Sequence, residues 1–592
     1  MKLTTTLLGL TLASTPLMAD TVGYMELEGG VLERQVMSSF FLSPDSPPTL
    51  RDVTATIDDA ADAGLDGFVI RVRNLAMSRA QIEEVGHALQ NLRDGGTRVH
   101  VFTEIYGPGE LMLASYADET IVQSGGAVSL PGMYMQEMFV ADALRMVGIE
   151  PDFIQVGDYK GASEMMANTE PSDPWNKNIS QLLDSMYEQQ TGQIAAGRDM
   201  SVEQLERAME SCFFATPQTA INEGVVDAAV DRLELNNHLE ARYGEDFEWD
   251  RSYDPSPVAD MPDFANMGFF EMFGAMMEMF NDVEASSGVD GDAIAVVHID
   301  GAIVDGESSA GSLFGGSTVG STTIRKALRE IERDDDVKGV IVRINSPGGS
   351  AIASESIWLG LRRVADRKPV WVSVGSMAAS GGYYIAVAGD QIYVDESSIV
   401  GSIGVVSGKL AMRGLFDKLN INVVARTRGP RGEIMGGLDP WTASDRALMR
   451  SKMVEVYDQF VGRVEAGREG IDISRTAEGR LFTGDKAIAL NMADKIGGID
   501  ATIEDLASEL GLSEYAVVDY PGPMSFEDTI NAMIPFAAAQ SQGPLSGANA
   551  GMLLREVVGP KHWPAVQDSL NAIMQMRQEP VLLTSPRTLI IP

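Results

Sequence analysis

Cysteine is almost absent from this sequence of 592 residues, which contains one, Cys212. A single cysteine excludes an intrachain disulfide, and the following Phe213 and Phe214 indicate a buried thiol rather than a nucleophile. Histidine is also scarce. The five histidines are scattered along the chain, and none has the His-x-x-x-His spacing of a metal site. We therefore expect neither a metal ion nor another cofactor.

Basic residues are few, with 45 lysines and arginines against 85 aspartates and glutamates, for a net charge of −40. Such a field repels phosphate backbones, so we expect no nucleic acid partner. The hydrophobic fraction of 44% and the mean hydropathy of −0.02 are ordinary for a soluble globular protein. At this length several domains are expected.

Long hydrophobic runs are missing except at the start, where Lys2 precedes an apolar stretch over Leu7–Ala19. The stretch is short for a transmembrane helix, which needs about 20 apolar residues. Met18-Ala19 before Asp20 offers a small-residue cleavage point, so residues 1–19 are predicted to be a signal peptide. An uncleaved anchor is the alternative. Either way we expect an exported protein.

The chain contains an internal repeat. Leu65–Val72 resembles Val337–Ile344, and Gly339 stands 272 positions after Gly67. The same offset holds without gaps as far as Gly157 and Gly429, so the chain is predicted to be a tandem duplication. The offset also matches the following pairs: Ala114 with Ala386, Asp118 with Asp390, Val122 with Val394, Gly132 with Gly404, and Ile149 with Ile421.

Each repeat alternates short β-branched runs with helical stretches, which predicts an α/β fold with parallel βαβ units. The predicted domains cover 24–232 and 291–520. In the second repeat, helices are expected over Thr322–Arg333 and Ser354–Ala365. Strands are expected over Ala293–His298, Gly339–Asn345, Pro369–Val374, Gln391–Val394 and Asn422–Ala425.

Two segments lie outside the repeats. Residues 233–290 are predicted to be a linker, whose second half carries Met and Phe at helical spacing between Phe269 and Phe280. A packing helix is favoured there over a lipid-touching lid. The tail over 521–592 is rich in Pro, Gly and Met, and no chemistry is assigned to it.

Three turns rich in glycine and serine distinguish the second repeat. Asn345–Ser350 contains Gly348 and Gly349, whose backbone N–H groups can face a ligand closely. Ser376–Tyr384 places Ser380 before Gly381 at the start of a predicted helix, where a serine oxygen meets a positive dipole end. The third turn contains Ser402.

The two repeats differ in these candidate catalytic residues. At the offset of 272, Ser380 corresponds to Pro108 and Ser402 to Leu130, so the first repeat lacks the serines. Lys160 in Gly-Asp-Tyr-Lys corresponds to Gly432, so the second repeat lacks that lysine. Each repeat therefore has a group that the other lacks.

Together, Ser-Met-Ala-Ala-Ser380-Gly-Gly-Tyr-Tyr, Asn-Ser-Pro-Gly-Gly, Gly-Ser402-Ile-Gly and Gly-Asp-Tyr-Lys160 resemble signal peptide peptidase A, or protease IV, in its long duplicated form. The resemblance implies a ClpP/crotonase-like fold, a homotetramer, and cleavage of released signal peptides at the periplasmic side of the inner membrane. It implies Ser380 as nucleophile, Lys160 as general base and Ser402 as the residue that orients the lysine. The implied oxyanion donors are the backbone N–H groups of Gly381, Gly348 and Gly349.

The chemistry of the residues agrees with this assignment. A serine nucleophile needs a base, and a lysine can serve if burial lowers its pKa from about 10.4 toward 7 or 8. A cleft between two domains would provide such burial. The predicted function is therefore a serine endopeptidase that acts on short hydrophobic peptides. Two alternatives remain: a non-catalytic peptide-binding scaffold, and a crotonase-type enzyme acting on acyl-CoA.

Overall fold

The computed structural model describes residues 19–34, 47–255, 291–309 and 317–522, together with the backbone of 582–584 and 590–591. The predicted signal peptide lies outside the described residues except for Ala19. The predicted Met- and Phe-rich helix and nearly all of the tail after residue 522 also lie outside them. None of the helices in the described ranges has the length and apolar character of a membrane span.

The first repeat is built on a six-stranded parallel sheet in the order β7-β4-β3-β2-β1-β8. Its strands carry near-continuous apolar runs because helices bury both faces. Helices α2 (Leu50–Ala63), α3 (Arg79–Asp94) and α4 (Pro108–Ala114) cover one face, and α10 (Leu235–Tyr243) covers the other. The strands are β1 (Thr21–Glu28), β2 (Gly67–Arg73), β3 (Arg98–Tyr106), β4 (Glu119–Val128), β7 (Ala228–Val230) and β8 (Glu248–Asp250).

The second repeat is built in a similar way, on a sheet in the order β18-β16-β14-β12-β9-β20, in which β18 is antiparallel to β16. Strand β15 pairs with β14, and β19 pairs with β15. Helices α12 (Ser321–Arg333), α13 (Ala351–Ala365) and α16 (Ala443–Gly467) cover one face, and α19 (Ile499–Leu510) covers the other. The strands are β9 (Ala293–Asp300), β12 (Val337–Ser346), β14 (Val370–Ala379), β15 (Gln391–Val394), β16 (Ile399–Gly401), β18 (Leu481–Thr483), β19 (Lys495–Ile496) and β20 (Ala516–Tyr520).

The predicted α/β duplication is confirmed, since β9 begins 272 positions after β1 and α13 begins 272 positions after α3. The structure differs from the prediction at the start of the linker. Residues 235–250 form α10 and β8, because Leu239 and Tyr243 pack on the first sheet and β8 extends it beside β1. The predicted strand Asn422–Ala425 is wrong, because every residue of this segment is exposed and none has a strand partner in the described residues.

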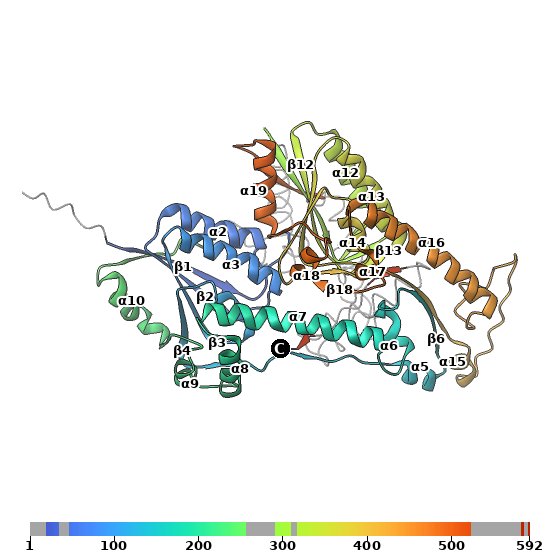
Figure 1. Ribbon diagram of the computed structural model, residues 1–592, viewed down its shortest axis with the longest axis horizontal. Helices are drawn as coiled ribbons and strands as arrows, with labels where there is room; N and C mark the ends of the chain where they lie inside the picture. Colours follow the sequence, from blue (N-terminus) through green and yellow to red (C-terminus); the bar gives the residue numbers. More distant parts are fainter. Residues whose placement is uncertain are drawn as a thin grey trace, which may run out of the picture.

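A third sheet joins the two repeats, in the order β11-β10-β13-β21-β17-β6. Strand β6 (Glu150–Val156) leaves the first repeat and pairs antiparallel with β17 (Val405–Ala411) of the second over seven residue pairs. Figure 1 accordingly shows β6 beside α16, far from β1–β4. The remaining strands are β10 (Ala302–Val304), β11 (Thr318–Gly320), β13 (Gly348–Ser350) and β21 (Leu582–Thr584).

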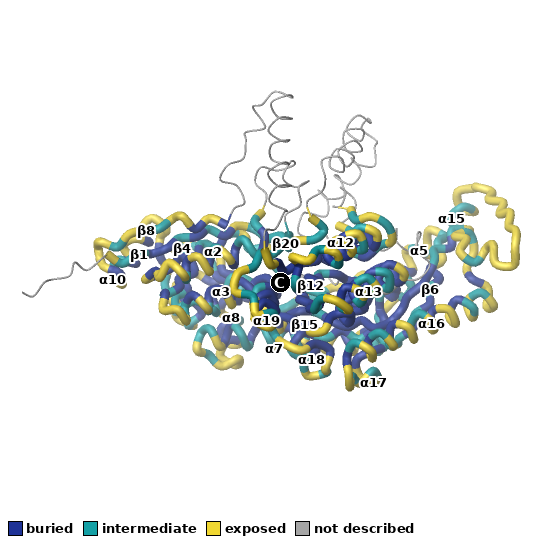
Figure 2. The backbone as a smooth tube through the Cα atoms, turned by 90° about the horizontal axis from the view of Figure 1, so that it is seen from above, coloured by how far each residue is buried: buried dark blue, intermediate teal, exposed yellow. Residues whose placement is uncertain are grey.

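A buried ionic cluster also joins the repeats. Arg343 on β12 donates to Glu33 at 2.9 Å and to Glu84 on α3 at 2.5 Å, and these three side chains are at most 5% exposed. Burial by itself would lower the pKa of Arg343, but the two carboxylates hold it above its usual range. In Figure 2 the neighbouring α3 and β12 are largely buried, so the repeats meet over a packed interface.

Candidate active site

Ser380 stands between β14 and α14 (Gly381–Ala386), where the chain turns sharply with a serine φ of 55°. Few residues other than glycine adopt positive φ, so the surrounding structure must hold this turn. The Ser380 N–H donates to Gly401 O at 2.7 Å, and Tyr384 N–H donates to Ser380 O at 2.8 Å. The side chain is fully buried, so the nucleophile candidate sits on a rigid turn inside the protein.

Lys160 comes from the other repeat and reaches this turn through the β6–β17 pairing. Val156 lies opposite Val405, so the residues that follow β6 lie beside those that precede β17. Lys160 Nζ is thereby placed 2.7 Å from Ser380 Oγ. It is also 2.9 Å from Ser402 Oγ and donates to Ser402 O at 2.8 Å. The structure thus brings together the three side chains that the sequence singled out.

The surroundings of Lys160 are tightly packed, and among the described residues no carboxylate forms an ion pair with it. Its side chain is 0% exposed, and burial lowers the pKa of Lys160 well below the usual lysine value. Added methyl groups would collide on two sides: a Cβ on Gly404 would lie 3.1 Å from Lys160 Cδ, and one on Gly479 would lie 2.6 Å from its Cα. The lysine therefore lies in a closed, buried slot formed by both repeats.

Ser402 occupies the turn between β16 and β17, also at a positive φ of 54°. Its N–H donates to Arg480 O at 2.6 Å, and its side chain is 2% exposed. Both of its oxygens lie within hydrogen-bonding distance of Lys160 Nζ. Ser402 is thus positioned to fix the direction of the amine.

The predicted oxyanion turns lie next to each other. A Cβ on Gly381 would lie 2.6 Å from Ser354 Oγ and 3.2 Å from Gly348 Cα, so glycine suits this close approach. Gly381 is the first residue of α14, where an N–H has no partner within its own helix. The Gly348 N–H donates to Ser346 Oγ at 3.1 Å, so it has a partner already. Gly349 lies in β13, between β10 and β21.

The sequence analysis missed the segment that closes the slot. Tyr159 N–H donates to Glu478 O at 2.8 Å, and the Arg480 guanidinium lies 4.0 Å above the Tyr159 ring. The sequence gives only a weak indication of this segment, namely a single glycine, Gly479, between two charged residues. A buried apolar cluster beside Ser380 was also missed, and it combines residues of both repeats: Trp175, Ile179, Leu182, Met186, Ala379 and Leu481, with the partly buried Met133, Met135, Met377 and Ile399 packed against it.

Comparison with known proteins assigns a family to this arrangement. The model of Peptidase family S49 matches residues 91–244 and 362–513, which together are just over half of the chain. The chain belongs to peptidase family S49. The first matched segment contains Lys160, and the second contains Ser380 and Ser402.

Several S49 relatives align over most of the chain. Protease 4 of Haemophilus influenzae is 26% identical over 477 residues, which cover 78% of this chain and 73% of that protein. Protease 4 of Salmonella typhi is 26% identical over 544 residues, 88% of this chain and 82% of that protein. The chloroplastic serine protease SPPA of Arabidopsis thaliana is 25% identical over 486 residues, 81% of this chain and 68% of that protein.

These matches confirm the resemblance to the long, duplicated form, because both repeats match the S49 model. As an S49 peptidase the chain is a serine protease, which favours hydrolysis over the scaffold and acyl-CoA alternatives. Within the described residues no group of three or more His, Cys, Asp or Glu side chains is arranged to hold a metal ion.

Proposed function

We propose that this S49 peptidase cleaves short hydrophobic peptides, released signal peptides among them, with Ser380 as nucleophile and Lys160 as general base. The observation that carries the proposal is the 2.7 Å separation of Lys160 Nζ and Ser380 Oγ inside a buried slot. A neutral amine at this distance can accept the hydroxyl proton as the serine attacks.

Burial favours a neutral lysine, and the hydrogen-bond geometry around Nζ can accommodate one. A neutral amine has two N–H groups and one lone pair, and three oxygens lie within 2.9 Å of Nζ. If Nζ donates to Ser402 O and Ser402 Oγ, its lone pair is left for the Ser380 hydroxyl. Ser402 is then a positioning residue, because it aims the lone pair at the nucleophile.

The reaction follows from these contacts in two halves. Lys160 takes the Ser380 proton while Oγ attacks the peptide carbonyl carbon, and the negative oxygen faces the N–H of Gly381, beside the Gly348–Gly349 turn. Lys160 then returns the proton to the leaving amine, and the C–N bond breaks to give an acyl-enzyme. Water, deprotonated by Lys160, releases the acyl group and restores Ser380.

The peptide substrate class rests on the surroundings of Ser380. Strand β13, which contains Gly349, pairs antiparallel with β21, so its edge accepts an extended segment. The partly buried Met133, Met135, Met377 and Ile399 at the edge of the apolar cluster would suit hydrophobic side chains. From the resemblance we also propose export to the periplasm, association with the inner membrane and assembly as a homotetramer.

The test is hydrolysis of a fluorogenic hydrophobic peptide by the full chain. We expect Ser380→Ala and Lys160→Ala each to lose at least about 100-fold in kcat, with an unchanged circular dichroism spectrum. Lys177→Ala, at an exposed lysine of the same repeat, should retain full activity. An active Lys160→Ala variant, or the failure of a peptide aldehyde to form an adduct at Ser380, would refute the proposal.

Activity should also depend on pH in a defined direction. Because burial lowers the pKa of Lys160, the amine is neutral at the upper end of the pH range and protonates as pH falls. We therefore expect kcat/KM to fall on the acid side with an apparent pKa below the free lysine value of 10.5. A flat profile between pH 5 and 9 would contradict a lysine base.

A further inference from the structure

One turn of the second repeat binds parts of the site from both repeats. It covers residues 478–480, directly before β18. Glu478 O accepts a hydrogen bond from the Tyr159 N–H at 2.8 Å, and Arg480 O accepts one from the Ser402 N–H at 2.6 Å. The turn therefore ties the residue that precedes the buried lysine to the serine that contacts its amine.

The backbone of this turn is bent into an uncommon conformation. Glu478 has a φ of 61° and Gly479 a φ of 90°, so two successive residues lie in the left-handed region. For a side chain as large as glutamate this conformation is unfavourable, and neighbouring contacts must hold it. Gly479 also lies against the lysine, since a Cβ there would be 2.5 Å from Lys160 N. Relaxation of the turn would therefore release the backbone of Lys160.

The Arg480 side chain folds back over the turn and holds it closed. Its Nη1 donates to Ala477 O at 2.9 Å, and its Nη2 lies 3.1 Å from the Glu478 carboxylate. The same guanidinium lies 4.0 Å from the centre of the Tyr159 ring. Arginine can stack on an aromatic ring while it donates in the plane of the guanidinium, which lysine cannot do. Arg480 thus joins the turn to the first repeat a second time.

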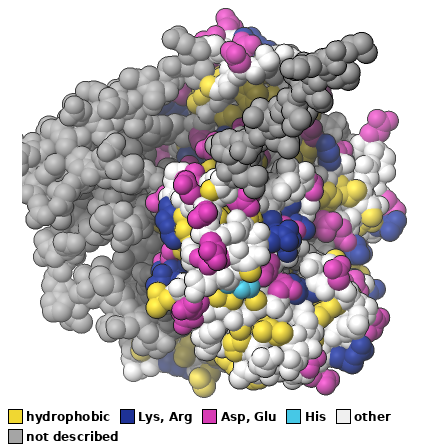
Figure 3. All heavy atoms as spheres, turned by 90° about the vertical axis from the view of Figure 1, so that its left-hand side faces the viewer, with side chains coloured by type: hydrophobic (Ala, Val, Ile, Leu, Met, Phe, Trp, Pro, Cys, Tyr) yellow, Lys and Arg dark blue, Asp and Glu magenta, His cyan; other side chains and the backbone are white. Residues whose placement is uncertain are grey.

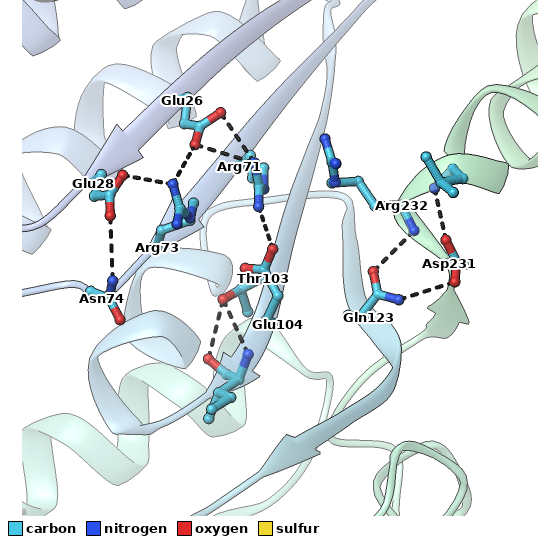
Figure 4. A network of polar contacts seen from close by, with 12 residues as sticks. Glu26, Glu28, Arg71, Arg73, Asn74, Thr103, Glu104, Gln123, Asp231 and Arg232 are labelled. Carbon is cyan, nitrogen blue, oxygen red and sulfur yellow. Dashed lines mark hydrogen bonds and ion pairs between the residues drawn. The ribbon is translucent and has the colours of Figure 1, made fainter.

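The surroundings of Arg480 differ from those of the ion-paired arginines in the first repeat. Figure 4 shows Arg71 between Glu26 and Glu104, which lie on the two neighbouring strands. Figure 3 looks onto this end of the molecule, where acidic and basic side chains lie close together on the described surface. Within the described ranges, the one carboxylate paired with Arg480 is that of Glu478, which is 44% exposed. Such an exposed pair contributes little stability, so the carbonyl and the ring are the contacts that matter.

The first repeat has no counterpart of this arginine. The middle residue of β16 lies opposite Phe482 on β18, and its equivalent in the first repeat, Val128, lies opposite Ala215. Two positions earlier, Arg480 therefore corresponds to Phe213, which is 60% exposed. The arginine accompanies the repeat that carries the two serines, and the shared fold does not require it.

We propose that Arg480 is a positioning residue for hydrolysis, because it holds the turn against Tyr159 and so fixes the place of Lys160. Arg480 acts through the backbone of the turn and not on the reacting atoms. The inference rests on the proposed function, in which the lysine amine, 2.7 Å from Ser380 Oγ, takes the proton of that hydroxyl. A displacement of about 1 Å from the reactive geometry can cost about 100-fold in rate. Loss of Arg480 should therefore lower kcat more than it changes KM.

The test is peptide hydrolysis by full-chain variants on both sides of this contact. Arg480→Met should lower kcat by about 10- to 100-fold with KM nearly unchanged, and Arg480→Lys should recover part of the loss. Tyr159→Leu should reproduce the loss, whereas Tyr159→Phe keeps the ring and should retain the wild-type kcat. Arg73→Met is the matched control and should keep full activity, because Arg73 pairs with Glu28 in the first repeat (Figure 4).

The pH profile supplies a readout that a loss of stability alone would not change. Burial lowers the pKa of Lys160, so water that enters an opened turn should raise this pKa toward the usual lysine value. The acid limb of kcat/KM should then move to higher pH in Arg480→Met and in Tyr159→Leu alike. If Arg480 acted only through its charge, Tyr159→Leu would keep the wild-type profile, and the positioning role would be refuted.

A double variant measures whether the two side chains act together. Arg480→Met combined with Tyr159→Leu should be little less active than either single variant, because both remove the same contact. Losses that multiply would show two independent effects and would overturn the inference. If Arg480→Met fails to fold, the comparison of Tyr159→Leu with Tyr159→Phe still decides, since equal activity of these two variants would also overturn it.

The role of Arg480 and the proposed function can fail separately. An active Lys160→Ala variant would refute the lysine base itself. An inactive Lys160→Ala together with a fully active Arg480→Met would leave the base in place and refute only the positioning role.

Discussion

Replacing Arg343 with methionine should destabilise the contact between the repeats, and it should cost more stability than removing one partner of an exposed ion pair. Arg343 is 2% exposed, and its guanidinium donates to Glu33, Glu84 and Ser373. Methionine fills a similar volume but provides no charge or donor. Two carboxylates that are at most 5% exposed are then left in the interface without a cation.

The magnitude follows from burial. Removing one partner of a buried ion pair costs about 3–5 kcal/mol, because the remaining charge is desolvated and uncompensated. The matched comparison is Arg413→Met, in the same repeat, where Arg413 pairs with Asp439 and both side chains are about half exposed. Exposed pairs contribute about 0–1 kcal/mol.

The assay is urea unfolding followed by tryptophan fluorescence, together with peptide hydrolysis. We expect the Arg343→Met midpoint to fall far more than that of Arg413→Met. Activity should be lost at lower urea concentration, because the interface also holds Lys160 against Ser380. Equal midpoints for the two variants would refute the argument that burial sets the cost.

The loss should depend on pH in a known direction. In the wild type, burial would raise the pKa of Glu33, but Arg343 holds it below its usual value of 4.5. Without Arg343, burial acts unopposed and the folded-state pKa rises. A raised acid pKa leaves stability intact below about 4.5 and lowers it as pH rises. The deficit of Arg343→Met should therefore shrink as pH is lowered toward 4.5; a deficit independent of pH would contradict this cause.

Three further predictions concern the site and the interface. Lys160→Met should abolish hydrolysis yet raise the melting temperature near neutral pH, because Lys160 binds a proton in the unfolded chain but not in its buried position. The gain in melting temperature should vanish as pH approaches 10.5, and a variant less stable than wild type at neutral pH would contradict this prediction. Burial raises the pKa of Glu83 to about 7, so wild type loses stability as pH rises and this carboxyl group ionises. In denaturation experiments the free energy of unfolding of Glu83→Gln should therefore gain up to about 3 kcal/mol relative to wild type between pH 4.5 and a pH above 7. The absence of a pH-dependent gain would count against a protonated Glu83 in the folded protein. A chain ending at Val581 lacks β21, so peptide substrates should bind the free edge of β13 with a lower KM, and an unchanged KM would show that β21 does not compete.

Local sequence was enough to predict the duplication, the α/β fold and the candidate nucleophile. The strand and helix patterns repeat at one offset, and the turn at Ser380 is dense in glycine because the backbone there approaches Gly348 closely. Helix boundaries in the second repeat were predicted within a few residues, since the apolar spacing of α12 and α13 is regular. These features depend on neighbours close in the chain.

The predicted strand Asn422–Ala425 shows where this reasoning fails. Its β-branched residues favour a strand, but a strand forms only where another strand can pair with it. The equivalent β6 has such a partner in β17, whereas 422–428 has none among the described residues. Propensity was the same in the two repeats, and tertiary pairing made the difference.

The sequence by itself determined that this chain has two related repeats, that one carries a serine in a glycine-rich turn, and that no histidine shares a motif with that serine. Only the tertiary structure decided that Lys160 meets Ser380, because the antiparallel pairing of β6 with β17 carries the lysine across the boundary between the repeats. The same holds for Arg343 with Glu33 and Glu84. Such contacts join residues more than 200 positions apart, and burial and strand register, which no local pattern encodes, determine which of them meet.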